Sequence, residues 1–305
     1  MKKAPLVIYH HPCADGMAAA WAVRLALPNA EFVPSHYGTN PPDVTGRDVI
    51  LVDFSYSADV LREMSATANT ILVIDHHESA ANDLGALRRP PKGAYRPDSW
   101  SWNVVEPTHC PVFAIFDMTH SGCVLAFHYF NPLLIPPLLL LHLEDRDLWR
   151  FHMHGTEEIQ AAVFSHPFDI DVYDRLMAMD VEKLYRDGKP ILRKYHRDID
   201  EILSAQVRLM TIAGHEVPVV NCSKVFGSDA ANELCKRNPD APFTAYYYDR
   251  ADCREISLRT IRDDVNVAEI AETYGGGGHR KAAGFITALD WNGDITIKEV
   301  TCAAC

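Results

Sequence analysis

The stretch Ile71-Leu72-Val73-Ile74-Asp75-His76-His77 consists of apolar residues followed directly by an acid and two histidines. Two earlier segments have the same form, because Asp53 follows the apolar run 49–52 and a pair of histidines follows the run 6–9. Apolar runs that do not alternate with polar residues are typical of strands buried on both faces of a parallel sheet. The first part of the chain therefore predicts an α/β, doubly wound fold with a parallel sheet.

Helical patterns separate the expected strands. We predict strands at 6–9, 31–35, 49–52, 71–74 and 112–116, with helices at 16–27, 58–66, 121–130 and 137–143. Residues 156–206 are mostly helical, and the many charges at 183–201 indicate a solvated helix or a helical connector between domains. Beyond residue 208 a smaller α/β domain is expected, with strands at 217–220, 244–248 and 255–258 and helices at 229–237 and 267–274. The predicted domains are therefore 1–180, a helical connector at 181–207, and 208–305.

Composition limits the class of protein. The chain has 305 residues, of which 48% are hydrophobic and 23% charged, which is typical of about two globular domains. Its net charge of −12 argues against a broad basic surface for duplex DNA, but it permits a short anionic ligand bound locally. No apolar run approaches the roughly 20 residues of a membrane span, so no membrane contact is expected. Eight sparse cysteines suggest reduced thiols and a cytoplasmic protein, with the pair Cys302 and Cys305 in an ordinary tail.

Acidic and histidine residues follow three of the expected strands, at 10–15, 53 and 75–77. The carboxyl ends of parallel strands lie along one edge of a sheet, where open α/β folds bind their ligands, so we expect these groups to converge. Carboxylate oxygens suit Mg²⁺ and Mn²⁺, while imidazole shifts the preference toward Mn²⁺, Co²⁺ or Zn²⁺. The pattern therefore predicts a divalent metal site at this edge.

Two motifs carry a resemblance to a known family. The segment Val73-Ile74-Asp75-His76-His77-Glu78 resembles the signature of the DHH superfamily of phosphoesterases. The glycine-rich stretch 275–285, which begins Gly275-Gly276-Gly277-Gly278-His279, is similar to the motif of the domain that follows the DHH domain in that superfamily. The resemblance spans essentially the whole chain and is greatest to the nanoRNase and bisphosphate-nucleotidase branch. It implies an enzyme that hydrolyses phosphoester bonds with two Mn²⁺ or Mg²⁺ ions.

The resemblance also implies ligands for the metals. It assigns one complete site to Asp15, Asp53, His76 and Asp145, with Asp53 shared between two ions and Asp147 as the alternative to Asp145. At the second site the chain departs from the family pattern, because Tyr9 and Cys13 stand where a His and an Asp are expected. Either His10 or His11 could replace the missing histidine, and Cys13 is either a soft ligand or a packed small residue.

The remaining assignments concern the phosphate. His77 is expected to protonate the leaving oxygen or contact the phosphate, or else to orient Asp75, which we interpret as mainly supporting. The residues implied to bind substrate are Arg259, Gly276, Gly277, Gly278, His279 and Arg280. Consecutive glycines let backbone amides approach an anion closely, although a glycine run is also an ordinary helix end.

Three functions fit these motifs. The preferred one is a metal-dependent phosphoesterase acting on short oligonucleotides or small phosphorylated nucleotides, as a possible homodimer. A pyrophosphatase or polyphosphatase with the same metals is the second, disfavoured because residues 208–305 lack a basic cluster. The third is a non-catalytic, nucleotide-binding regulator, suggested by Tyr9 and Cys13.

Overall fold

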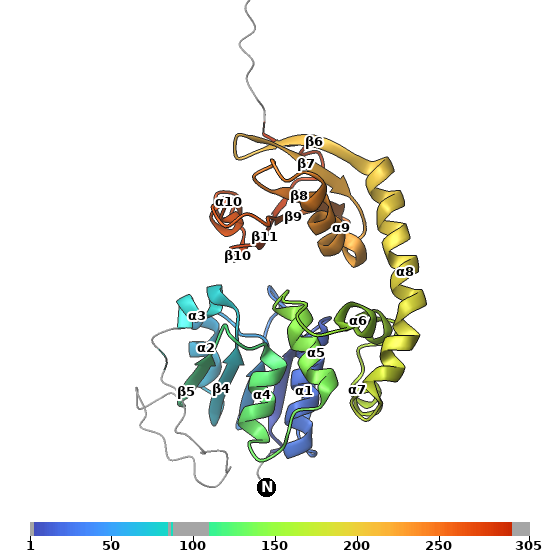
Figure 1. Ribbon diagram of the computed structural model, residues 1–305. Helices are drawn as coiled ribbons and strands as arrows, with labels where there is room; N and C mark the ends of the chain where they lie inside the picture. The colour runs from blue at the N-terminus through green and yellow to red at the C-terminus, as the bar shows by residue number, and fades with distance from the viewer. Residues whose placement is uncertain (1–2, 85–86, 88–109, 295–305) are drawn as a thin grey trace, which may run out of the picture. The chain divides into compact units, whose positions relative to one another are not determined.

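The computed structural model describes residues 3–84, 87 and 110–294. It divides the chain into two compact units, Met1–Arg193 and Lys194–Cys305, which are drawn in Figure 1. The cysteine pair at 302 and 305 lies outside the described residues. No helix in the described ranges is long and apolar enough to cross a membrane.

Unit 1 is built on a five-stranded parallel sheet (Figure 1). Its strands are β1 (Leu6–His10), β2 (Glu31–Ser35), β3 (Asp48–Val52), β4 (Thr70–Asp75) and β5 (Val112–Phe116). Their order in the sheet is β2-β1-β3-β4-β5, and each neighbouring pair is parallel. This order confirms the predicted fold class. The chain first adds β2 on one side of β1 and then β3 on its other side, so the point between β1 and β3 is the switch point at which such sheets bind ligands.

Helices cover both faces of this sheet. They are α1 (Ala14–Ala26), α2 (Ala58–Ser65), α3 (Glu78–Leu84), α4 (Gly122–Phe130), α5 (Leu138–Asp147), α6 (Thr156–Phe164) and α7 (Ile170–Met177). Val7 and Ile50 belong to a core shared with α1, α4 and α5, whereas their neighbours Ile8 and Leu51 belong to a second core with α2. Successive strand residues point to opposite faces, so a sheet covered on both sides needs strands that are apolar throughout.

The long helix α8 (Val181–Gln206) occupies the predicted connector, and the boundary between the two units falls inside it, after Arg193. Ion pairs one helical turn apart line its surface, such as Lys183 with Asp187 and Arg197 with Glu201. Exposed pairs of this kind contribute only about 0.3–0.5 kcal/mol each. Its charges therefore belong to a solvated helix, as the sequence pattern indicated.

Unit 2 contains a six-stranded mixed sheet with the order β10-β11-β9-β8-β7-β6. Its elements are β6 (Val207–Ile212), β7 (His215–Asn221), α9 (Lys224–Arg237), β8 (Thr244–Asp249), β9 (Arg254–Arg259), α10 (Val267–Glu272), β10 (Gly277–His279) and β11 (Ala282–Thr287). The sequence predictions found β7, β8 and β9 but not β6, β10 or β11. Glycine is depleted in strands, which hides β10 and β11. Glycine at position 276, just before β10, lets the chain pass close to β11, because a Cβ on it would lie 2.1 Å from the carbonyl oxygen of Gly284.

Candidate metal centre

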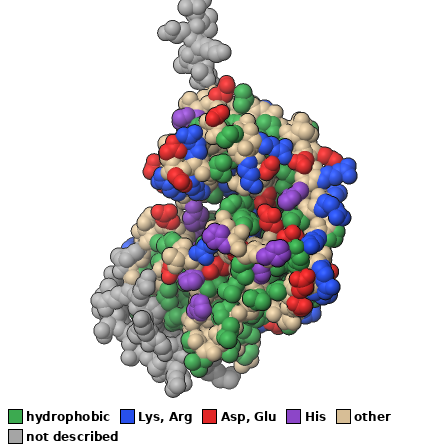
Figure 2. All heavy atoms as spheres, in the orientation of Figure 1, with side chains coloured by type: hydrophobic (Ala, Val, Ile, Leu, Met, Phe, Trp, Pro, Cys, Tyr) green, Lys and Arg blue, Asp and Glu red, His purple; other side chains and the backbone are tan. Residues whose placement is uncertain are grey.

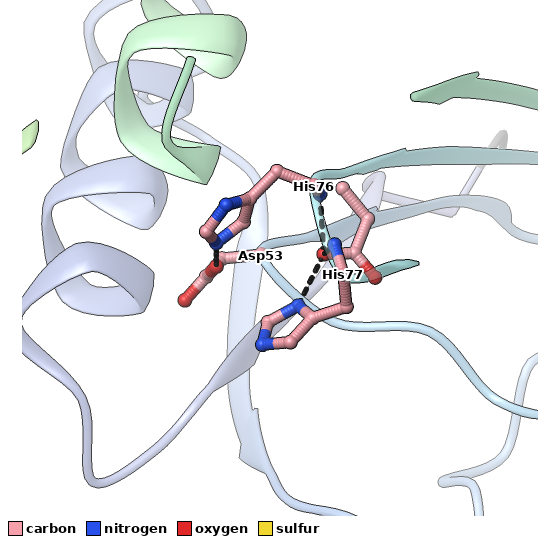
Figure 3. Close-up of side chains that lie close together, drawn as sticks. Asp53, His76 and His77 are labelled. Carbon is pink, nitrogen blue, oxygen red and sulfur yellow. Dashed lines mark hydrogen bonds and ion pairs between the residues drawn. The ribbon is translucent and has the colours of Figure 1, made fainter. Parts of the chain in front are cut away.

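Asp53 lies at the centre of a cluster formed where β1, β3 and β4 end (Figure 3). Its side chain is only 1% exposed. One carboxylate oxygen, Oδ1, is 3.2 Å from Nε2 of His76, and the other, Oδ2, is 3.4 Å from Nδ1 of His10. Neither oxygen has a hydrogen-bond partner of good geometry within the described part of the chain. A buried carboxylate whose two oxygens face two different imidazoles is suited to bridge two cations.

The backbone at Asp53 is also unusual. Its φ of 54° lies in the left-handed region, which non-glycine residues seldom adopt and which costs of order 1–3 kcal/mol. The amide of Asp53 donates to the carbonyl of Ile74, which holds this turn against β4. Strain of this kind persists only where the surrounding structure maintains it, and here it directs the carboxylate into the cluster.

Asp15, His76 and Asp147 gather beside Oδ1 of Asp53. Nε2 of His76 is 3.8 Å from Oδ2 of Asp15 and 3.4 Å from Oδ2 of Asp147. The amide of Cys123 donates to Oδ1 of Asp15 at 3.1 Å, which leaves Oδ2 of this buried carboxylate without a hydrogen-bond partner among the described residues. Together with Asp53, the group offers three carboxylates and one imidazole.

The proximity of these acids changes their protonation. Burial, together with the charges of Asp53 and Asp147, raises the pKa of Asp15 well above its ordinary value. Burial alone would lower the pKa of His76, but the Asp53 carboxylate and the other acids raise it to about 10. Burial would likewise raise the pKa of Asp53, but the neighbouring imidazoles lower it. A proton on His76 thus supplies the positive charge that a cation would otherwise provide.

The structure places Asp147, and not Asp145, in this cluster. The Asp145 carboxylate accepts hydrogen bonds from the amides of His152 and Met153 at 2.8 and 3.1 Å and from the Thr156 hydroxyl at 2.6 Å. These donors lower its pKa although burial opposes the shift. The Asp145 carboxylate therefore holds the loop after α5. Asp147, which the sequence analysis gave as the alternative ligand, is the acid that lies beside His76.

A second group consists of His10, Cys13 and Asp53. The ligand atoms of these three residues lie within 4.8 Å of one another. The neighbouring His11 packs its ring edge-on against Tyr9 and Phe168, and it belongs to no ligand cluster in the described ranges. Of the two histidines proposed from the sequence, the structure therefore brings His10 to Asp53.

Asp75 and His77 form a further group with Asp53 and His76, and Figure 3 shows His77 beside Asp53 and His76. Nδ1 of His77 lies 2.7 Å from Oδ1 of the buried Asp75, and the same oxygen accepts from the amides of His76 and His77. Burial would lower the pKa of His77, but Asp75 raises it to about 9. Asp75 therefore orients a protonated imidazole whose other nitrogen, Nε2, is directed away from this carboxylate.

Sequence reasoning missed the contribution of the start of α4. A Cβ added to Gly122 would lie 2.5 Å from Cβ of Asp53 and 2.9 Å from Oδ2 of Asp15, so glycine lets the helix approach both carboxylates. Just before it, Nδ1 of His120 lies 3.0 Å from Glu144, which also pairs with Arg150 at 3.4 Å. The Ser-Gly pair at the predicted helix start was the available signal.

In the space-filling view, histidine and acidic side chains gather on the face shown (Figure 2).

Unit 2 contains a cavity of about 400 Å³ beside the glycine-rich stretch. Gly275 and Gly276 line it with Tyr246, Tyr248 and Lys224. The other residues expected to bind substrate do not line this cavity, namely Arg259, Gly277, Gly278, His279 and Arg280.

Two of these residues make contacts within unit 2. Arg259 donates to the hydroxyls of Ser257 and Ser228, both at 2.9 Å. Arg280 donates to the carbonyl of Asp263 at 2.8 Å. Their substrate-binding roles stay predictions.

The donor atoms of unit 1 fit divalent cations. The buried carboxylate oxygens that lack a hydrogen-bond partner on Asp15 and Asp53 depend on the positive charge of His76, which a divalent cation could replace. Three carboxylates and an imidazole suit Mg²⁺ or Mn²⁺, and the group with a thiol is softer. A metal-binding centre at the predicted edge of the sheet is thus consistent with the arrangement of the side chains.

Comparisons with known proteins agree with this fold. No family model matches the chain. A solved structure of a DHH domain, described as belonging to a family of ribosomal proteins, superposes with a TM-score of 0.59 at 13% identity, covering 93% of this chain and 83% of that one. The chain therefore shares the fold of that DHH domain, as the resemblance of the two motifs implied.

Two curated proteins are similar in sequence. The uncharacterized protein R106 of Acanthamoeba polyphaga mimivirus is 26% identical over 301 residues, which cover 92% of this chain and 66% of that protein. The oligoribonuclease NrnB of Bacillus subtilis (strain 168) is 32% identical over 114 residues, which cover 37% of this chain and 25% of NrnB. The chain thus spans just under two thirds of the first relative and a quarter of the second.

Proposed function

We propose that this chain is a metal-dependent phosphoesterase that hydrolyses phosphoester bonds in short oligonucleotides or small phosphorylated nucleotides. The observation that carries the proposal is the buried carboxylate of Asp53, whose two unpartnered oxygens face His76 and His10. The partial similarity to an oligoribonuclease supports the class of substrate. The acidic net charge of −12 favours a short substrate over a long nucleic-acid track.

Each acid of the cluster has a part in holding two ions. Asp15, His76 and Asp147 would hold one cation together with Oδ1 of Asp53, and His10 with Oδ2 of Asp53 would hold the other. When bound, a pair of Mn²⁺ or Mg²⁺ ions supplies an activated water and neutralises charge on the phosphate oxygens. Metal binding would displace the proton that His76 holds in the metal-free protein.

We infer that His77 acts on the phosphate. Nδ1 of His77 donates a hydrogen bond to Oδ1 of Asp75 at 2.7 Å, which fixes the orientation of the imidazole beside Asp53. With a pKa raised to about 9, the imidazole is charged at neutral pH and can donate a hydrogen bond to a phosphate oxygen or a proton to the leaving oxygen. The Tyr37 ring lies edge-on to His77 with the ring centroids 5.8 Å apart, and it limits the movement of the imidazole.

The cavity of unit 2 supports binding of a nucleotide. The half-buried Tyr248 offers ring surface for a base, and Lys224 offers a positive charge for a phosphate. A cytoplasmic location and a homodimer are further proposals that stand on the sequence alone.

The test is hydrolysis by the purified full chain with Mn²⁺. The substrates are di- to pentanucleotides, 3′,5′-adenosine bisphosphate, pyrophosphate and a long single strand. The matched control is Asp53→Asn, because asparagine keeps the shape of the side chain and tolerates the left-handed φ of 54°.

We expect mononucleotides from the short oligomers or phosphate from the bisphosphate, and loss of this turnover in Asp53→Asn. Phosphate released from pyrophosphate alone would overturn the class of substrate. Absence of turnover in the wild type, with nucleotide binding retained, would indicate a regulator and overturn the enzyme.

A further inference from the structure

The ligand group of His10, Cys13 and Asp53 contains a donor of a kind that the group of Asp15, His76 and Asp147 lacks, the thiol of Cys13. This group combines a nitrogen from His10, a sulfur from Cys13 and an oxygen from Asp53, all within 4.8 Å of one another. The group around His76 contains only carboxylates and imidazole. The two sides of Asp53 therefore present different chemistry to a cation.

Two further observations indicate a ligand at this group. Oδ2 of Asp53, on a side chain that is 1% exposed, lies 3.4 Å from Nδ1 of His10, and each atom is buried without a hydrogen-bond partner in the described ranges. Native proteins rarely leave two such atoms unsatisfied side by side. A cation between them would satisfy both atoms.

Cys13 is placed to join these two atoms. It occupies the N-cap position of α1 with an extended backbone, and its side chain makes no capping hydrogen bond. It is a free cysteine, and the residue is half-buried, so its sulfur takes part in no disulfide. Ser, Thr, Asp and Asn are the residues that usually cap a helix, which leaves a cysteine here without a capping explanation.

We propose that His10, Cys13 and Oδ2 of Asp53 form a site for a borderline divalent cation of the class of Zn²⁺, Co²⁺ and Fe²⁺, so that the centre holds two different metals. A thiolate favours these ions over Mg²⁺ and Mn²⁺, whereas the three carboxylates at the other site suit the harder ions. On binding, the sulfur–hydrogen bond of Cys13 breaks, a sulfur–metal bond forms, and the proton passes to solvent. The three protein ligands leave a position open for water or substrate. The inference rests on the proposed function only in treating both groups as parts of one metal centre.

The test uses Co²⁺ as a spectroscopic probe of the metal-free full chain. Coordination of a thiolate to Co²⁺ produces a sulfur-to-metal charge-transfer band in the near ultraviolet, which oxygen and nitrogen ligands do not produce. We expect this band to saturate at one Co²⁺ per chain and to persist in excess Mg²⁺. A Co²⁺ complex of the wild-type chain without the band would overturn the proposal.

Three variants assign the band to the sulfur. Cys13→Ser should abolish the band and weaken Co²⁺ binding at this site by roughly tenfold or more. Loss of a residue that only supports a metal ligand already lowers metal affinity by about 10–100-fold, and loss of the ligand itself should cost at least as much. Cys13→Asp should abolish the band and shift the preference of the site toward Mn²⁺ in competition calorimetry. Cys110→Ser changes a half-buried cysteine outside the ligand groups and should leave the band intact. A band that persists in a folded Cys13→Ser variant, as checked by circular dichroism, would overturn the proposal.

The outcome can be separated from that of the proposed function. A thiolate band in a chain that hydrolyses no phosphoester would retain this inference and reject the enzyme. Hydrolysis supported by Mn²⁺ in a chain that gives no thiolate band would retain the enzyme and reject the mixed-metal site.

Discussion

Replacing Gly122 by alanine tests how closely α4 approaches the metal centre. The added Cβ would lie 2.5 Å from Cβ of Asp53, 2.7 Å from its Oδ1 and 2.9 Å from Oδ2 of Asp15. All three distances are below any ordinary contact, so the helix or the carboxylates must move. Because Oδ1 of Asp53 and Oδ2 of Asp15 are the atoms facing His76, the displacement falls directly on the predicted ligands.

Two opposing terms set the size of the effect. Alanine in a helix is favoured over glycine by up to about 1 kcal/mol, so the Gly122→Ala substitution would stabilise the protein if the site were open. Overpacking of a filled site costs about 1–3 kcal/mol. We therefore expect a net loss of up to about 2 kcal/mol in the free energy of unfolding without metal, and a larger proportional loss in Mn²⁺ affinity.

The assay combines urea denaturation of the metal-free protein with calorimetric titration of Mn²⁺. Asp53→Asn serves as the reference for a centre that has lost its bridging charge. A Gly122→Ala protein that is as stable as the wild type and binds Mn²⁺ equally well would refute the close approach of α4 to Asp53 and Asp15.

Three other predictions follow from the cluster. Asp147→Asn should weaken Mn²⁺ binding, measured by calorimetry, with little change in stability. Asp145→Asn should instead lower the free energy of unfolding by about 1–3 kcal/mol, because it weakens three hydrogen bonds of a buried acceptor. The reverse pattern in calorimetry and denaturation would contradict the assignment of Asp147 to the cluster. In the metal-free protein the pKa of His76 is about 10 against about 6.5 in an unfolded chain, so its contribution to stability is complete below pH 6.5 and is lost as the pH rises through 10. For the same reason Mn²⁺ binding at pH 7.5 should release about one proton, measurable in buffers of different ionisation enthalpy, and no release would count against the charged imidazole. Mn²⁺ at 100 times its dissociation constant should stabilise the wild type by about 2.7 kcal/mol, a gain that a chelator reverses and that Asp53→Asn lacks.

The parallel sheet was predictable because each of its central strands is an uninterrupted apolar run. The strands β1, β3 and β4 have residues on both cores, so their sequences carry no polar alternation that could suggest a helix or an exposed sheet. The strand β6 was not predictable, because it follows α8 without an intervening turn and its residues Val207 and Leu209 are exposed. Its status as a strand depends on pairing with β7, which is a tertiary contact.

The choice between neighbouring site residues also depends on structure. His10 and His11 are adjacent at the end of β1, where successive side chains point to opposite faces, so the sequence could name the pair but not the member that reaches Asp53. Asp145 and Asp147 are separated by about 200° around α5, given about 100° per helical residue. The predicted helix ended at 143, before either acid, and therefore gave no face on which to place them.

The most direct test of the account is an anomalous diffraction map of crystals of the full chain grown with Co²⁺, an ion that both donor groups accept. We expect two peaks about 3.5–4 Å apart, the usual separation in two-metal sites. One peak should be bound by Oδ1 of Asp53 with His76 and Asp147, and the other by Oδ2 of Asp53 with His10. A single peak, or two peaks that do not share Asp53, would contradict the central claim that this carboxylate bridges two metal ions.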